Sequence, residues 1–237
     1  MAGTTGPIVM AANDTLIDLR RILADRVPSA RLGVAEPPPA SVIPTGLEVL
    51  DRLLGGGLPA GETVELVGEG PGSGTAQVLH GLLARSSADG RFLALVDGAD
   101  SFDADAAEAA DLSRLLWVRC RQASEALQAA DILLRDRNFP LVVLDLKLNP
   151  ATQLRRIPGT VWHRFGRLLE QQRTALLVVT PQALVSGAAV RVRCSWRAGV
   201  ESLAGTPGSA AASLRFEVLR QTPALQVLPT GRSLAAG

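Results

Sequence analysis

The stretch VELVGEGPGSGTAQVL, residues 64–79, has the pattern of a strand, a glycine-rich loop and a helix. In a phosphate-binding loop, a glycine and four further residues precede glycine, lysine and serine or threonine, because backbone N–H groups hold the phosphates while the lysine neutralises their charge. Counted from Gly68, the second glycine position holds Ser73, the lysine position holds Gly74, and the magnesium-binding hydroxyl falls on Thr75. The loop therefore keeps a phosphate-binding pattern but lacks its cation.

Two interpretations of this loop stay open. Its glycines, Gly68, Gly70, Gly72 and Gly74, allow the backbone around Ser73 to form an anion-binding nest at the N-terminus of the next helix. The alternative is a tight turn between a strand and a helix that binds nothing.

Two aspartates follow apolar runs and are candidates for the same site. Asp145 lies near the end of FPLVVLDL, and Asp97 follows the run FLALV. In open sheets of parallel strands, ligands bind at the carboxyl ends of the central strands. Asp145 is placed to hold magnesium through water. Asp97 either faces the same crevice or caps the turn that follows it.

Composition limits the class of protein. The 237 residues are 47% apolar and include 23 glycines, enough for one sizeable α/β core. The 24 basic and 23 acidic residues give no polyelectrolyte character, so nucleic-acid binding would need a local patch. Cys120 and Cys194 lack metal-ligand spacing, and no signal or membrane segment is recognisable. We expect a cytoplasmic protein in a reducing compartment, with no metal site and no membrane contact.

Hydrophobic periodicity predicts alternating strands and helices. Expected strands cover residues 63–67, 92–96, 115–120, 139–146, 175–180, 189–196 and 213–221, and expected helices cover 46–54, 75–85, 104–110, 124–135 and 161–172. The alternation predicts an α/β fold with a mainly parallel sheet flanked by helices and late antiparallel strands. An N-terminal helix, from Asn13 or Asp14 to about Val27, precedes a linker rich in proline and alanine. We divide the chain into this helix and linker (1–40), a core (41–225) and a tail (226–237).

Arginines gather in one later segment. Arg155, Arg156, Arg164 and Arg167 lie close together, with Trp162 among them. Such a patch can hold a phosphate backbone while the aromatic ring stacks on a base, which predicts weak, sequence-independent DNA binding or a partner-binding surface. A solvated helix face with a core tryptophan explains the same residues.

Residues 42–75 and the segments LVDGADSFD and FPLVVLDL together resemble the core of RecA-type recombinases. The resemblance covers roughly residues 42–182 and implies a RecA-like phosphate-loop fold in which Asp145 is the Walker B acid. It places the γ-phosphate-sensing glutamine on Gln182. The glutamate that activates water in that family falls on Ala99 and the loop lysine on Gly74, so two catalytic parts are missing. Both DNA-binding loops are shortened as well.

A RecA-type scaffold with these losses is similar to ImuA-type proteins, the accessory proteins of the bacterial translesion mutasome. That resemblance implies a non-catalytic role in SOS-inducible translesion synthesis and damage-induced mutagenesis. The implied partners are RecA, an ImuB-type Y-family polymerase homologue and an error-prone replicative polymerase complex. We expect no cofactor, with residual ATP and magnesium binding left open. The alternatives are a weak DNA-stimulated ATPase of RecA type, which would need a cation such as Lys147, and a SulA-like inhibitor of cell division.

Overall fold

The computed structural model describes residues 8–11, 41–107, 112–170, 172–196, 214–222 and 233–235. A nine-stranded sheet runs in the order β1-β6-β5-β7-β8-β4-β9-β10-β11, and β2 pairs with β3 beside it. The strands are β1 (Ile8–Ala11), β2 (Val42–Ile43), β3 (Leu58–Pro59), β4 (Thr63–Val67), β5 (Leu93–Asp97), β6 (Leu115–Arg119), β7 (Leu141–Asp145), β8 (Ala175–Thr180), β9 (Val190–Trp196), β10 (Leu214–Gln221) and β11 (Ser233–Ala235). The strands from β1 to β9 in this order are parallel, and β10 and β11 are antiparallel additions. The predicted α/β fold with a mainly parallel sheet is confirmed.

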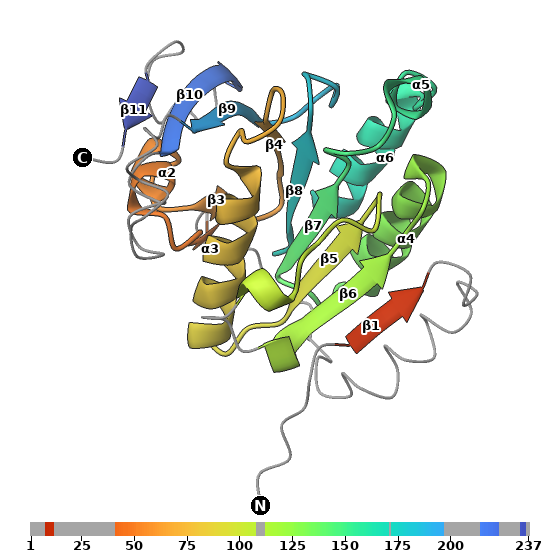
Figure 1. The fold of residues 1–237 in the computed structure, drawn as a ribbon, viewed down its shortest axis with the longest axis horizontal. Helices are drawn as coiled ribbons and strands as arrows, with labels where there is room; N and C mark the ends of the chain where they lie inside the picture. The colour runs from red at the N-terminus through yellow and green to blue at the C-terminus, as the bar shows by residue number, and fades with distance from the viewer. Residues whose placement is uncertain are drawn as a thin grey trace, which may run out of the picture.

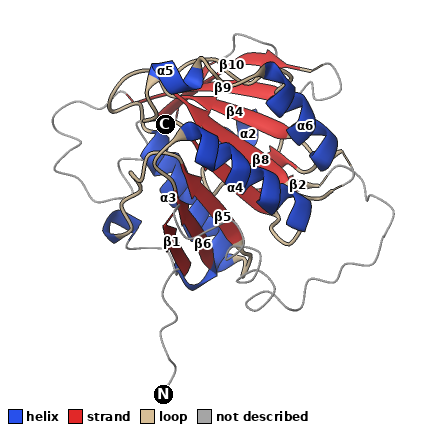
Figure 2. Ribbon diagram, turned by 90° about the vertical axis from the view of Figure 1, so that its right-hand side faces the viewer, coloured by secondary structure: helices blue, strands red, loops and turns tan. Residues whose placement is uncertain are grey.

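Helices cover both faces of the sheet (Figures 1 and 2). The α-helices are α2 (Glu48–Leu53), α3 (Thr75–Ala88), α4 (Ala123–Asp136), α5 (Ala151–Leu154) and α6 (Gly159–Leu169). Ala94 and Val96 of β5 belong to the core beneath α4 and α6, whereas Leu93 and Leu95 of the same strand belong to the core beneath α2 and α3. Successive side chains of a strand point to opposite faces, so one strand contributes to both cores. No helix among the described residues combines the length and apolar character needed to span a bilayer.

The central strands are buried on both faces, which explains why their sequences are mostly apolar, with Glu65 in β4 as a buried exception. Every residue of β4, β5 and β8 is buried, as are the first four residues of β7. Parallel strands between two helical layers require this pattern. As a result, the predicted bounds of β4 and β8 agree with the structure.

Outside the central strands, the structure departs from several predicted elements. β9, one of the late strands, is parallel to β4, with Val64 opposite Val190, and only its other neighbour, β10, is antiparallel to it. The helix expected over residues 104–110 is a single 3-10 turn, Asp105–Ala107, within the described part, and a second such turn covers Leu112–Arg114. The strand β1, which no pattern predicted, pairs with β6 at one edge. The N-terminal helix predicted from Asn13 or Asp14 to Val27 lies outside the described residues.

Candidate functional site

The phosphate loop connects β4 to α3 at the carboxyl end of the sheet. Gly70, Gly72 and Gly74 have φ angles of +70°, +67° and +86°, a region that disfavours residues with a Cβ atom. Gly74 is the last residue before α3. The glycine spacing of the sequence therefore serves a loop whose backbone needs glycine at alternate positions.

Neighbouring strands crowd position 74, where the family has its lysine. A Cβ atom on Gly74 would collide with Cδ2 of Leu214 on β10 and would lie 3.3 Å from Cβ of Trp196 on β9. The thiol of Cys194, also on β9, donates a hydrogen bond of 3.2 Å to the carbonyl oxygen of Ser73. Packing of β9 and β10 against the loop, together with the positive φ of Gly74, therefore disfavours any residue with a Cβ atom at this position.

A cation reaches the loop from another part of the chain. Lys147, the only lysine in the sequence, lies two residues beyond β7. Its ammonium donates hydrogen bonds to the carbonyl oxygens of Gly68, at 2.5 Å, and Gly70, at 2.9 Å, and to the hydroxyl of Ser73. An ammonium has three N–H donors, so these three acceptors satisfy it completely. The sequence names Lys147 only as a cation from outside the loop, and the tertiary structure brings its ammonium into contact with the loop.

Asp145 lies at the end of β7, as a Walker B residue would. One oxygen of its carboxylate accepts a hydrogen bond of 2.9 Å from the backbone N–H of Lys147. Burial raises the pKa of Asp145 to about 6, with the charge of Asp97 adding to the rise and Lys147 opposing it. Burial also lowers the pKa of Lys147, which Asp145 partly offsets. The site therefore holds a buried carboxyl and a partly desolvated ammonium beside the phosphate loop.

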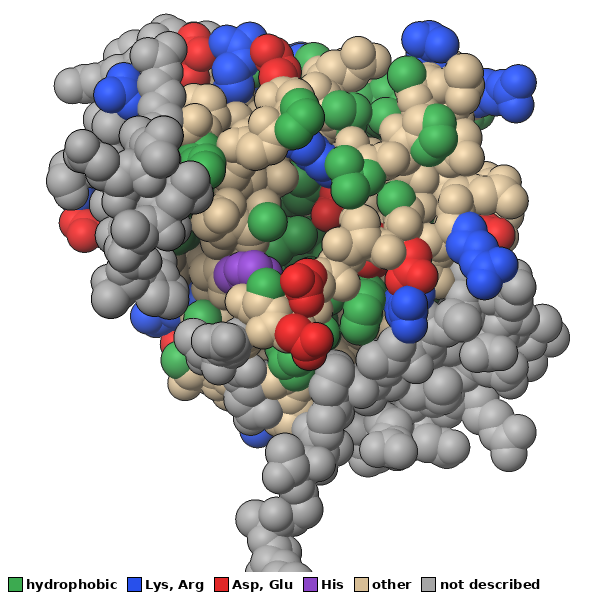
Figure 3. Space-filling model, in the orientation of Figure 1, with side chains coloured by type: hydrophobic (Ala, Val, Ile, Leu, Met, Phe, Trp, Pro, Cys, Tyr) green, Lys and Arg blue, Asp and Glu red, His purple; other side chains and the backbone are tan. Residues whose placement is uncertain are grey.

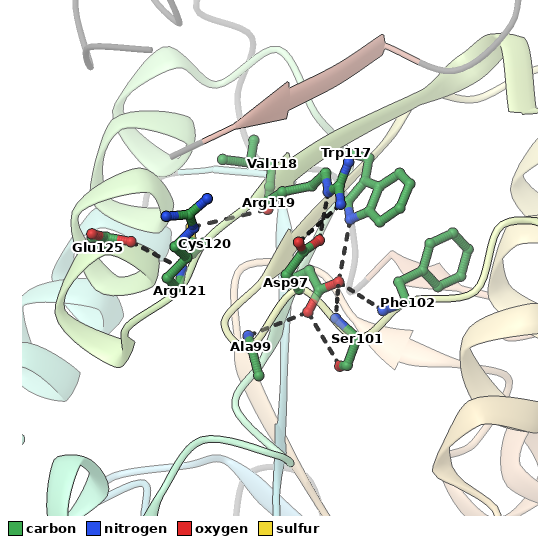
Figure 4. Close-up of polar contacts among 11 residues, drawn as sticks. Asp97, Ala99, Ser101, Phe102, Trp117, Val118, Arg119, Cys120, Arg121 and Glu125 are labelled. Carbon is green, nitrogen blue, oxygen red and sulfur yellow. Dashed lines mark hydrogen bonds and ion pairs between the residues drawn. The ribbon is translucent and has the colours of Figure 1, made fainter. Parts of the chain in front are cut away.

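Asp97 organises the turn after β5 (Figure 4). One oxygen accepts hydrogen bonds from the backbone N–H groups of Ser101 and Phe102, at 2.8 and 2.7 Å, and from the indole of Trp117, at 3.3 Å. The other accepts hydrogen bonds from the N–H of Ala99 and the hydroxyl of Ser101, both at 3.3 Å. Of the two roles predicted for Asp97, these contacts favour the cap of a turn over a free ligand in the crevice.

Asn149 is a site residue that the sequence interpretation missed. It is buried beside the turn that contains Ala99, and its amide donates a hydrogen bond of 2.7 Å to the carbonyl oxygen of Gly98. Its Oδ1 atom is buried and has no hydrogen-bond partner among the described residues. A single asparagine in a loop gives no sequence signal for such a position.

Glu65 is a second missed residue, fully buried in the middle of β4. One carboxylate oxygen accepts hydrogen bonds from the hydroxyl of Thr180 and the backbone N–H groups of Leu184 and Val185, at 3.1, 2.6 and 3.0 Å. The other forms an ion pair with Arg191 on β9. Glu65 thereby fixes the backbone of the segment after β8 by hydrogen bonds, and Gln182 lies exposed on this segment.

The structure exposes the arginines of the predicted patch but buries its tryptophan. The side chains of Arg155, Arg156, Arg164 and Arg167 are exposed around α5 and α6. Arg164 forms an ion pair of 2.8 Å with Asp131 on α4. Trp162 is only 4% exposed and packs edge-on against Phe165, so its indole belongs to the core and does not face a base at the surface.

The face of the molecule seen in Figure 1 is hollowed near its centre (Figure 3). Hydrophobic side chains surround the hollow, and acidic side chains lie along its lower side. Most basic side chains of this face lie toward its periphery. The hollow on this face is therefore lined mainly by apolar and acidic side chains and is not a basic groove.

Comparison with known proteins agrees with this geometry. The model of the RecA N-terminal domain family matches residues 26–156. The RecA proteins of Clavibacter michiganensis subsp. michiganensis and Leifsonia xyli subsp. xyli are 37% and 36% identical over 118 residues, which cover 48% of this chain but 32% and 33% of theirs. RecA of Mycobacterium tuberculosis is 37% identical over 118 residues, 15% of its length. The match thus spans about a third or less of these relatives. Because the family model covers more than half of the 237 residues, the chain belongs to the RecA N-terminal domain family.

Proposed function

We propose that this RecA-family protein is a non-hydrolysing accessory factor of SOS-inducible translesion DNA synthesis. In this proposal it acts in the cytoplasm through contacts with RecA, an ImuB-type Y-family polymerase homologue and an error-prone replicative polymerase complex. The resemblance to ImuA-type proteins supplies these partners. The loop chemistry supplies the expectation that ATP is not hydrolysed.

One observation carries the proposal: the ammonium of Lys147 is held by three acceptors of the phosphate loop itself. In this arrangement no N–H of the lysine remains for a phosphate oxygen. The position of the water-activating glutamate holds Ala99, whose side chain cannot accept a proton. Both departures favour a scaffold over an ATPase.

The segment after β8 supports the same proposal. In the recombinase family this segment leads from the γ-phosphate sensor into a DNA-binding loop. Here the segment is short, covering residues 181–189. The buried carboxylate of Glu65 accepts hydrogen bonds from the backbone N–H groups of Leu184 and Val185 within it. A loop that is bonded to a central strand is poorly suited to move when nucleotide binds.

The position of Lys147 also favours a second candidate, a weak ATPase in which this lysine replaces the missing loop cation. Its ammonium already lies within hydrogen-bond distance of Gly68 and Gly70. Thr75 and Asp145 would be the residues to hold magnesium beside a bound nucleotide. In this candidate the ammonium exchanges loop carbonyls for phosphate oxygens.

Nucleotide titration separates the two candidates. Purified wild-type protein, Lys147→Ala and Asp145→Ala would be titrated with a fluorescent ATP analogue and magnesium, and ATP hydrolysis would be measured with and without single-stranded DNA. We expect no saturable binding below millimolar nucleotide and no hydrolysis above that of Asp145→Ala. Saturable binding or DNA-stimulated hydrolysis that both variants abolish would establish the ATPase instead.

Partner binding is tested separately, by pull-down of purified RecA, ImuB-type homologue and division GTPase. We expect association with RecA or the polymerase homologue. Association with the division GTPase alone would favour the SulA-like alternative.

A further inference from the structure

Exposed apolar residues gather on three loops at the carboxyl end of the sheet. These loops follow β7, β8 and β4, which are neighbours in the sheet. Leu148, after β7, is 64% exposed, and the other exposed large hydrophobic residue in the described part of the chain is Val42, at 37%. Pro150, Ala183 and Pro71 are exposed on the same three loops. We call Leu148, Pro150, Ala183 and Pro71 the edge surface.

Direct contacts hold the loops of the edge surface together. Lys147 joins the loop after β7 to the phosphate loop through the carbonyl oxygen of Gly70, the residue before Pro71. The segment that carries Ala183 is held by Glu65, through the N–H groups of Leu184 and Val185. The edge surface is therefore built on segments that are bonded to one another or to the core.

Leu148 is fixed by both of its neighbours. Lys147 is bonded to the phosphate loop, and Asn149 is buried with its amide on Gly98. The N–H of Asn149 also donates to the carbonyl oxygen of Leu146, at 3.2 Å, and Pro150 restricts the backbone further. The backbone of so constrained a turn loses little conformational entropy when Leu148 binds a partner.

The charge beside the edge surface identifies the kind of partner. The helix α5 begins directly after Pro150, and Arg155 and Arg156 follow its last residue. Both side chains are exposed, and neither forms an ion pair with any described residue. Apolar surface with a polar rim is typical of protein-interaction sites, and this rim is basic.

We propose that the edge surface docks a protein partner that offers an apolar pocket for Leu148 and acidic side chains for Arg155 and Arg156. A buried, preorganised anchor in the middle of an interface commonly dominates its affinity. Arg155 and Arg156 accelerate and orient the encounter from the rim. The inference rests on the proposed function only for the identity of the first partners to be tested.

The test measures affinity of purified RecA and ImuB-type homologue for wild type, Leu148→Ala, Arg155→Glu/Arg156→Glu and the control Val42→Ala. Leu148 and Val42 are both exposed, so neither change should alter the thermal unfolding midpoint. We expect Leu148→Ala to weaken binding at least tenfold and Arg155→Glu/Arg156→Glu to weaken it at least fivefold, with a smaller salt dependence. Val42→Ala should bind like wild type.

Two outcomes would overturn the docking surface while leaving the proposed function intact. One is binding by Leu148→Ala within twofold of wild type, and the other is unchanged binding by Arg155→Glu/Arg156→Glu. If Arg155→Glu/Arg156→Glu weakens binding of a single-stranded oligonucleotide but not of either protein, the two arginines bind nucleic acid and the inference is wrong.

A second arm decides the matter if wild type binds neither protein, which would refute the partners of the proposed function. A photo-crosslinking amino acid would replace Leu148, or Val42 as control, in the full chain incubated with cell extract. One identified protein, crosslinked at 148 but not at 42 through a peptide with apolar and acidic residues, would support the docking surface. Crosslinking at 148 no more specific than at 42 would refute it.

Discussion

The ammonium of Lys147 donates a hydrogen bond of 2.9 Å to the carbonyl oxygen of Gly70, a residue 77 positions earlier in the chain. The contact joins the turn after β7 to the phosphate loop after β4, although β8 separates the two strands in the sheet. It places the only lysine of the chain where a phosphate-binding loop needs its cation.

Replacing Lys147 with methionine should destabilise the fold. The change removes three hydrogen bonds from a charged donor, but part of the site is open to solvent, so we expect a loss of about 1–2 kcal/mol in the free energy of unfolding. Urea unfolding measures it. Arg52→Met is the matched control, because Arg52 pairs with Glu48 on an exposed helix face and should cost less than about 0.5 kcal/mol. Equal stability of the two variants would contradict the contact.

Restoring the lysine of the family, as Gly74→Lys, should not restore a working loop. The left-handed backbone and the collision with Leu214 should together cost about 2–4 kcal/mol. Gly70→Lys is the control: Gly70 also has a positive φ, but open space surrounds its Cα, so only about 1–2 kcal/mol should be lost. Leu214→Ala should remove the collision in Gly74→Lys, although it leaves a cavity that costs stability by itself. The two free-energy changes should therefore not add, and a double-mutant cycle in urea measures the difference. Additive costs would show that Leu214 does not obstruct position 74.

Asp97→Asn should be among the more damaging single changes. An amide NH₂ would face N–H and O–H donors that now surround a carboxylate, at a cost of about 2–4 kcal/mol. Asp103→Asn provides the comparison, since Asp103 is exposed and caps a short turn through Asp105. It should cost under about 1 kcal/mol. Thermal unfolding followed by circular dichroism distinguishes the two, and a similar midpoint for both would refute the role given to Asp97.

Asp145 should make stability fall as the pH rises from about 4 to about 6. The folded protein holds the proton of this carboxyl more tightly than the unfolded chain, because burial raises its pKa from 3.8 to about 6. Ionisation therefore disfavours the folded state across this interval, by up to about 2–3 kcal/mol. Below pH 4 the stabilisation from the protonated carboxyl of Asp145 is fully present. Asp145→Asn should lack this component, so the difference between the two urea-unfolding curves against pH isolates it, and parallel curves would rule it out.

DNA binding should be weak, independent of sequence and steeply dependent on salt. Replacing Arg155, Arg156, Arg164 and Arg167 together with alanine should reduce affinity for a single-stranded oligonucleotide at least tenfold at low salt and flatten the salt dependence. Fluorescence anisotropy measures both. Arg52→Ala/Arg85→Ala/Arg91→Ala/Arg135→Ala, which removes the same four positive charges from other exposed positions, controls for net charge. Unchanged affinity in the fourfold variant would exclude the patch as a DNA site.

Much of the core could be predicted because burial leaves a local signature. β7 and β8 are almost continuous apolar runs, since helices cover both of their faces. The glycine spacing and the acid at the end of β7 likewise identified the region of the candidate site. A short 3-10 turn, such as Asp105–Ala107, has too few residues to show a helical hydrophobic period in the sequence.

Other features depend on partners that are distant in sequence. β1 has four residues and takes its place only by pairing with β6, with Ile8 opposite Leu116. The parallel direction of β9 depends on its neighbour β4, whereas its alternating pattern fits either direction. The residue type of Glu65 does not indicate burial, and its buried carboxylate is compensated by an ion pair with Arg191, 126 positions away.

The sequence by itself determined the α/β class, the central strands, the phosphate-loop pattern and the absence of a lysine and a glutamate at two family positions. These depend on residue type and local spacing, which the chain carries directly. Only the tertiary structure decided that Leu214 obstructs position 74, that Trp162 belongs to the core and that Lys147 reaches the loop. The physical reason is that each of these depends on side chains from separate elements meeting within a few ångströms, and the order of strands in the sheet determines which elements meet.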